Sequence, residues 1–256
     1  MSPAPELEVV AWIASIDEAS RSLARVVAQA GFDAPVPPCP DWRVRDLVQH
    51  LGGVHRWATV HVAEQREKAM PKPEATDLMA SFPADGFLLE WFAVGHQALR
   101  GVLAGAPADL NCWSFLPAPS PLAFWARRQA HETEIHRADA ELAAGVDVTP
   151  FSPEIAADGV AEMLFGFAPR RRRLELESEI RIELLPHDRP DGWLVQLGPD
   201  GVRAQRGRGD ADCRVSGTTS ELYLWLWNRL PESALEVDGP RSALAVWRRS
   251  VTVTWS

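Results

Sequence analysis

Lysine is almost absent from this chain, and basic residues as a whole are outnumbered. Only two of the 256 residues are lysine, so arginine supplies nearly all of the positive charge, which we attribute to the codon bias of a GC-rich genome. The 26 basic residues face 35 acidic ones, for a net charge of -9. That balance provides no broad basic face and argues against a nucleic-acid-binding protein.

Cysteine and long apolar runs are also scarce. The three cysteines, Cys39, Cys112 and Cys213, are odd in number and widely separated, which is typical of reduced thiols and not of a disulfide framework. No apolar run reaches the roughly 18 residues that a membrane-spanning helix needs. The N-terminus lacks the basic, apolar and small-residue order of a signal peptide. The sequence therefore predicts a cytoplasmic protein that enters no membrane, and we expect a monomer or a weak dimer.

The first part of the chain has the apolar periodicity of helices. Long helices are expected over residues 6–29, 42–68, 85–103 and 122–144. Asp41 is the expected N-cap of the second helix, and Asp46 suits the dipole at its start. The proline-containing stretches 71–83 and 105–120 are predicted as loops. Four long helices joined by loops predict a four-helix bundle.

The pattern changes near residue 150. A helix is expected over residues 153–167, strands over 179–185, 193–197 and 213–216, and helices over 220–228 and 240–248. The predicted fold class is therefore α+β. We expect an N-terminal metal-binding bundle over residues 1–150 and a smaller C-terminal α+β domain over residues 151–256, with the boundary between 150 and 175.

Three side chains on two of the predicted helices suit a metal ion. Glu132 and His136 are four residues apart and therefore share one helix face. His50 lies on a largely apolar stripe of the second helix and is expected to face the bundle interior. Two imidazoles and a carboxylate suit zinc, and also iron, nickel or manganese. Three protein ligands with one vacant position are typical of a catalytic zinc site.

Spacing alone leaves a simpler interpretation open, in which His50 is a packed core histidine and Glu132–His136 is a surface pair. A zinc-protease motif is excluded, because His131 and His136 are five residues apart and lie on different helix faces. We expect the other histidines to be structural: His55, His61, His96 and His187.

Three further features have two interpretations each. Cys112, in the loop before the predicted fourth helix, could approach the site, but we expect an ordinary buried thiol. The basic run Arg170–Arg173 is better explained as an exposed linker than as an anion site, because acidic residues follow it. The pair Gly52–Gly53 indicates either close helix packing or room for a ligand beside the metal, and the sequence does not choose between them.

Two segments resemble a known family. They are Cys-Pro-Asp-Trp…Val-Arg-Asp-Leu-Val…His-Leu-Gly-Gly, within residues 39–53, and Trp-Ala-Arg-Arg…His-Glu-Thr-Glu-Ile-His-Arg, within 125–137. Both are similar to motifs of the mycothiol-dependent maleylpyruvate isomerases, part of the DinB-like group of thiol-dependent metalloproteins. Residues 222–231 and 235–239 resemble that family's C-terminal domain. The resemblance implies a DinB-like four-helix bundle, a sterol-carrier-like α+β domain, and zinc on His50, Glu132 and His136.

The resemblance also implies an activity. A zinc ion, or another divalent metal, would bind the cosubstrate mycothiol and convert it to a nucleophilic thiolate. Addition of the thiolate to an activated double bond would allow cis–trans isomerisation of a small electrophilic substrate, whereas displacement of a leaving group would make the protein a thiol S-transferase. A hydroxide on the same ion would instead favour hydrolysis. Candidate clamps for a dicarboxylate substrate are the C-terminal arginines Arg229, Arg241, Arg248 and Arg249.

An alternative from a different class is a non-catalytic protein that binds a metal and a small ligand. The number of protein ligands discriminates the two, because a fourth ligand closes the metal site and three leave a position for a cosubstrate.

Overall fold

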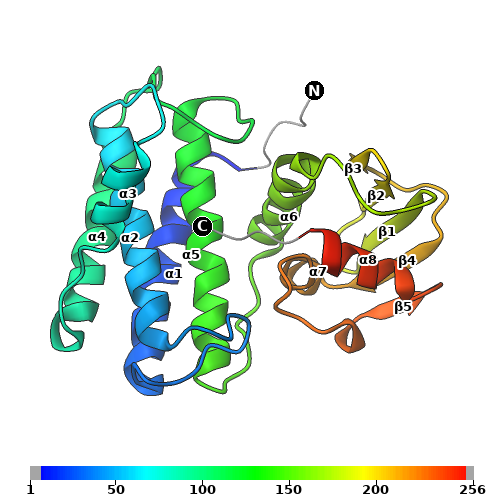
Figure 1. The fold of residues 1–256 in the computed structure, drawn as a ribbon, viewed down its shortest axis with the longest axis horizontal. Coiled ribbons are helices and arrows are strands. Elements are labelled where there is room, and N and C mark those ends of the chain that lie inside the picture. The colour runs from blue at the N-terminus through cyan, green and yellow to red at the C-terminus, as the bar shows by residue number, and fades with distance from the viewer. Residues whose placement is uncertain (1–6, 252–256) are drawn as a thin grey trace. The chain divides into compact units, whose positions relative to one another are not determined.

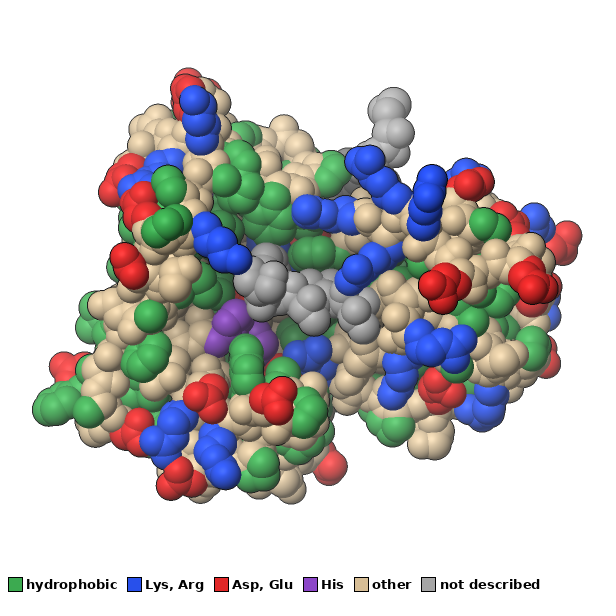
Figure 2. Space-filling model, in the orientation of Figure 1, with side chains coloured by type: hydrophobic (Ala, Val, Ile, Leu, Met, Phe, Trp, Pro, Cys, Tyr) green, Lys and Arg blue, Asp and Glu red, His purple; other side chains and the backbone are tan. Residues whose placement is uncertain are grey.

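The computed structural model describes residues 7–251, which form two compact units (Figure 1). One unit ends at Thr149 and the other begins at Pro150. Within residues 7–251, no helix is both long and apolar enough to cross a bilayer. On the face drawn in Figure 2, acidic and basic side chains are intermixed on each unit.

The first unit is a bundle of four long helices with one short helix added. Its helices are α1 (Val9–Ala30), α2 (Val44–Ala63), α3 (Lys72–Met79), α4 (Asp85–Gly105) and α5 (Pro121–Ala143). Helices α1 and α2 each pack against both α4 and α5, and α3 packs against α2. The predicted four-helix bundle is confirmed; the predicted start of the first helix at Glu6 lies outside the described residues.

Two local predictions in this unit were wrong. Arg43, and not Asp41, occupies the capping position of α2, because its backbone N–H donates to the carboxylate of Asp46 at 2.8 Å. The stretch 71–83 was predicted as a loop, yet α3 occupies most of it, with Pro73 in its first turn. Proline is tolerated there because the first turn of a helix has no intrahelical acceptor for its N–H.

Buried apolar side chains from several helices hold α2 in place. Leu47 and Leu51 of α2 belong to one buried cluster with Leu23 and Val27 of α1 and Phe92 of α4. Burying one such side chain contributes about 1.5–3 kcal/mol to stability. Leu51 directly follows His50, so this packing also fixes where the His50 side chain leaves the helix.

The second unit combines a five-stranded sheet with helices. It contains α6 (Pro153–Glu162), followed by a π-helical turn (Met163–Phe167) and a short 3-10 helix (Ala168–Arg170), then α7 (Thr219–Leu226) and α8 (Ser242–Ser250). Its strands are β1 (Ile180–Pro186), β2 (Trp193–Gly198), β3 (Gly201–Arg206), β4 (Cys213–Gly217) and β5 (Glu236–Asp238). The sheet order is β3-β2-β1-β4-β5, with only β1 and β4 parallel.

The predicted α+β class is confirmed, and two strands were missed. Strand β5 has three residues, and β3 carries two arginines, so neither shows an apolar alternation. Thr218 caps α7, because its hydroxyl oxygen accepts the N–H of Glu221 at 3.2 Å. The run Arg170–Arg173 is exposed, as a linker would be. The assignment of separate functional roles to residues 1–150 and 151–256 stays a prediction.

The structure explains the two consecutive glycines of α2 by close helix packing. A Cβ atom at Gly52 would lie 2.1 Å from the indole ring of Trp91 on α4, and one at Gly53 would lie 3.0 Å from the backbone oxygen of Met79 on α3. The Trp91 ring is itself covered by the guanidinium of Arg56, 3.7 Å from its centroid. The ring therefore has little freedom to move away from α2.

The substitution Gly52→Ala should lower the free energy of unfolding by about 1–2 kcal/mol, because overpacking against Trp91 outweighs the helix propensity that alanine adds. Urea unfolding followed by circular dichroism measures the change. The matched control is Gly101→Ala in α4, where an added Cβ meets no heavy atom within 4 Å. That control should gain up to about 1 kcal/mol. Equal stability of the two variants would contradict the packing argument.

Candidate metal centre

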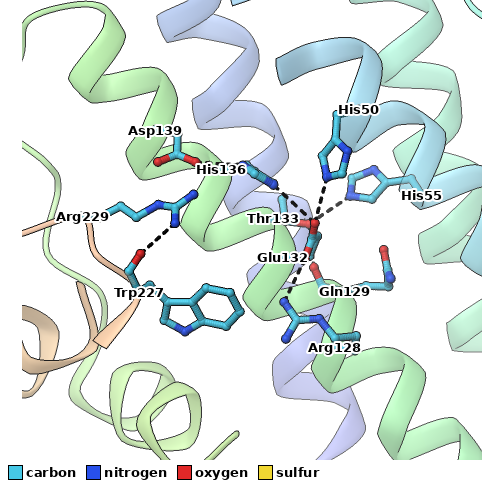
Figure 3. A network of polar contacts seen from close by, with 10 residues as sticks. All are labelled: His50, His55, Arg128, Gln129, Glu132, Thr133, His136, Asp139, Trp227 and Arg229. Atoms are coloured by element: carbon cyan, nitrogen blue, oxygen red, sulfur yellow. Dashed lines mark hydrogen bonds and ion pairs between the residues drawn. The ribbon is translucent and has the colours of Figure 1, made fainter. Parts of the chain in front are cut away.

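Helices α2 and α5 pack against each other and bring the three predicted ligands together. His50 comes from α2, and Glu132 and His136 come from one face of α5 (Figure 3). The start of α5 is well defined: Ser120 is its N-cap, with a hydroxyl that accepts the N–H of Ala123 at 3.1 Å, and Pro121 is its first residue. Glu132 and His136 therefore share one face of α5, as their spacing predicted, and the packing of α2 against α5 brings His50 to the same place.

The three side chains converge on one carboxylate oxygen. Oε1 of Glu132 lies 3.1 Å from Nε2 of His50 and 3.3 Å from Nε2 of His136. Ligand atoms from the three residues all lie within 4.8 Å of one another, and among residues 7–251 no other group of three or more such donors occurs. The cluster is largely buried, with the His50 side chain 12% exposed. That these residues bind a metal stays a prediction.

Two side chains that were not among the predicted site residues hold the cluster in place. The buried Arg128 donates from Nη2 to Oε2 of Glu132 at 2.9 Å. The carboxylate of Asp139 lies 2.9 Å from Nδ1 of His136 and is itself fully buried. Arg128 precedes Glu132 by four residues, and Asp139 follows His136 by three, so helical spacing carried a signal for both.

An aromatic ring packs against both imidazoles. The ring centroid of Trp42 lies 4.8 Å from that of His50 and 5.9 Å from that of His136, and the latter pair is stacked. Trp42 belongs to the segment before α2, so the turn that begins this helix also restricts both rings.

The charges of the cluster are strongly coupled. Burial by itself would raise the pKa of Glu132, but hydrogen bonds from His136 and His50 and the charge of Arg128 outweigh it and hold that pKa well below its ordinary value. Burial would lower the pKa of His136, yet its hydrogen bonds to Asp139 and Glu132 raise it to about 9. Glu132 is therefore an anion across the ordinary pH range, as a metal ligand must be.

The residues present fit a divalent metal ion. Asp139 engages Nδ1 of His136, which leaves Nε2 on the side of Glu132, and this carboxylate–histidine arrangement is the usual support of a metal-binding imidazole. Two imidazoles and one ionised carboxylate form a donor set that zinc accepts.

Comparisons with known proteins assign the chain to a family. The model of the mycothiol maleylpyruvate isomerase N-terminal domain matches residues 13–141, and that of the C-terminal domain of the same family (MDMPI) matches residues 154–246. The chain belongs to the mycothiol-dependent maleylpyruvate isomerase family. No curated protein matches it.

Solved structures support the fold of this family member. A crystal structure of the mycothiol-dependent maleylpyruvate isomerase aligns with a TM-score of 0.62 at 12% identity, and one of a mutant of that enzyme with 0.63 at 13%. Each alignment covers 91% of this chain and 94% of the other. At such identity the likeness shows a shared fold.

The remaining sequence candidates lie outside the cluster. Nε2 of His55 is hydrogen-bonded to the hydroxyl of Thr133 at 2.9 Å, and burial lowers the pKa of His55 to about 3. Cys112 is a buried thiol, as expected, whose sulfur accepts the indole N–H of Trp125 at 3.2 Å and whose pKa burial raises. Arg229, Arg241, Arg248 and Arg249 belong to the second unit, and their substrate role stays a prediction.

Metal affinity should depend on pH because the metal must displace a proton from His136. With a pKa of about 9 in the metal-free protein, this imidazole is protonated at neutral pH. The apparent association constant should therefore rise about tenfold per pH unit until about pH 9 and level off above. Chelator competition at several pH values measures the slope, and calorimetry in buffers of different ionisation enthalpy counts the released protons. An affinity that does not change between about pH 7 and 9 would contradict the coupling.

Substituting Asp139→Asn should weaken metal binding about 10- to 100-fold, because the amide keeps the shape but loses the charge that supports His136. The matched control is Glu141→Gln on the same helix, whose carboxylate pairs with Arg137 at 2.7 Å and lies outside the ligand cluster. Chelator competition should show unchanged affinity for the control. Equal losses in both variants would mean that α5 had simply been destabilised.

Proposed function

We propose that this family member is a metal-dependent enzyme, with zinc as the ion, that uses mycothiol to isomerise a small electrophile such as maleylpyruvate, or that joins mycothiol to such an electrophile through the thiol sulfur. Three donors on two helices support this proposal: His50, Glu132 and His136. Within the described part of the chain no fourth donor joins them, whereas a structural or sensing site is usually closed by four. The three-donor count therefore favours the enzyme over a non-catalytic metal-binding protein.

The chain's own residues would prepare the site before any thiol arrives. Asp139 orients the His136 ring, Trp42 restricts both imidazoles, and Arg128 keeps the buried Glu132 ionised. A divalent ion held by the three ligands would lower the pKa of a coordinated thiol, which is the chemistry that mycothiol requires. Burial of the cluster excludes water and strengthens these electrostatic interactions.

The same proposal places the protein in the cytoplasm. None of its three cysteines forms a disulfide, as expected in a reducing compartment. The partners would be mycothiol and a small electrophilic substrate, which the family's name indicates. A monomeric or weakly dimeric state is part of this proposal.

The test compares the wild type with His136→Ala. Elemental analysis should find one metal ion per wild-type chain and almost none in the variant, while circular dichroism shows that both fold. Mycothiol is then titrated by calorimetry into the metal-loaded and metal-free wild type. Thiol binding should require the metal, and turnover of maleylpyruvate would complete the assignment.

The exposed His187 offers a control, because it lies in the second unit, 3.6 Å from Glu236, and outside the ligand cluster. His187→Ala should keep its metal and its thiol affinity. A His136→Ala variant with full metal content would refute the ligand assignment. A metal-loaded wild type that binds no mycothiol would support the non-catalytic alternative.

A further inference from the structure

The two oxygens of the Glu132 carboxylate have different partners. Oε1 faces the imidazoles of His50 and His136, and Oε2 accepts a hydrogen bond from Arg128 at 2.9 Å. Figure 3 shows Arg128 approaching the carboxylate from the side opposite to the two histidines. Arg128 is 2% exposed, and the Glu132 side chain is 4% exposed. Neither group can replace its partner with bulk water.

We propose that Arg128 is a positioning residue whose hydrogen bond occupies Oε2 of Glu132. The carboxylate then offers a metal ion only one oxygen, and the site selects ions that accept four ligands. This inference rests on the proposed function, because it presumes that the cluster binds a metal. It adds a determinant of metal choice that the three ligands alone do not supply.

The geometry makes this arrangement rigid. Arg128 and Glu132 are one turn apart on α5, so no movement between helices separates them. A guanidinium–carboxylate hydrogen bond is charge-assisted and directional, and it is strongest where water is excluded. Rotating the carboxylate to present both oxygens to an ion would break this bond inside the protein.

The choice of metal follows from coordination chemistry. Zinc is usually four-coordinate in proteins and binds imidazole well, whereas manganese, magnesium and calcium prefer six or more ligands that are mostly oxygen. A bidentate Glu132 would supply the additional oxygen that these harder ions need. The positive charge of Arg128 also offsets the charge of Glu132, which penalises ions that depend on carboxylates more than ions that depend on imidazoles.

The experiment compares the full chain with Arg128→Met, Arg128→Lys and Arg137→Met. Arg137 is the matched control: it is buried on the same helix and pairs with Glu134 at 2.8 Å and Glu141 at 2.7 Å, outside the cluster. Chelator competition gives the zinc and manganese affinities of each protein. A second readout is the visible absorption of the Co(II)-loaded protein, which is intense for four-coordinate cobalt and weak for six-coordinate cobalt.

In Arg128→Met the ratio of zinc to manganese affinity should fall by about tenfold or more, with weaker Co(II) absorption. Arg128→Lys keeps a charge and one donor and should restore most of the ratio, and Arg137→Met should leave the ratio unchanged. An equal loss of affinity for both metals in Arg128→Met, or the same change of ratio in Arg137→Met, would overturn the proposal.

Two further outcomes remain decisive if Arg128→Met does not fold. Intense, four-coordinate Co(II) absorption of the wild type supports the proposal. Weak, six-coordinate absorption of the wild type overturns it. A wild type that binds no metal refutes the proposed function itself, whereas a wild type that binds metal without selecting between zinc and manganese refutes this inference alone.

Discussion

The candidate site depends on the charge of one buried carboxylate. Glu132 lies among helices where an unpaired anion would be strongly destabilising, and two imidazoles and a guanidinium compensate it. Its partners are supported in turn, since Asp139 pairs with His136 and Trp42 packs against both histidines. The site is therefore one coupled network in which each member fixes the orientation or protonation of another.

Most of that network is built on a single helix. Helix α5 carries Arg128, Glu132, His136 and Asp139 at spacings of three or four residues, so their relative positions follow from helix geometry. Helix α2 adds His50, and its distance from α5 depends on packing throughout the bundle. Gly52 and Gly53 are part of this packing, because they let α2 approach α3 and α4 without a side chain between the helices.

The difference between apolar packing positions and buried charged positions explains how the family fold is kept at low sequence identity. The chain shares 12–13% identity with the solved structures of the mycothiol-dependent maleylpyruvate isomerase, yet the alignments cover 91% of it. A helical bundle tolerates many apolar replacements as long as pattern and volume are kept. Charged groups buried together tolerate far fewer, because removing one leaves another without compensation.

The sequence by itself determined what depends on local periodicity: the four long helices, the α+β class, and the shared face of Glu132 and His136. The apolar pattern did not predict the short or polar elements α3, β3 and β5, because their stability comes from contacts with neighbouring elements. Only the tertiary structure decided that His50 meets the α5 pair, that the two glycines serve packing, and that Arg128 takes one oxygen of Glu132. The reason is physical: helix geometry fixes distances within one element, whereas distances between elements depend on how all the intervening side chains pack.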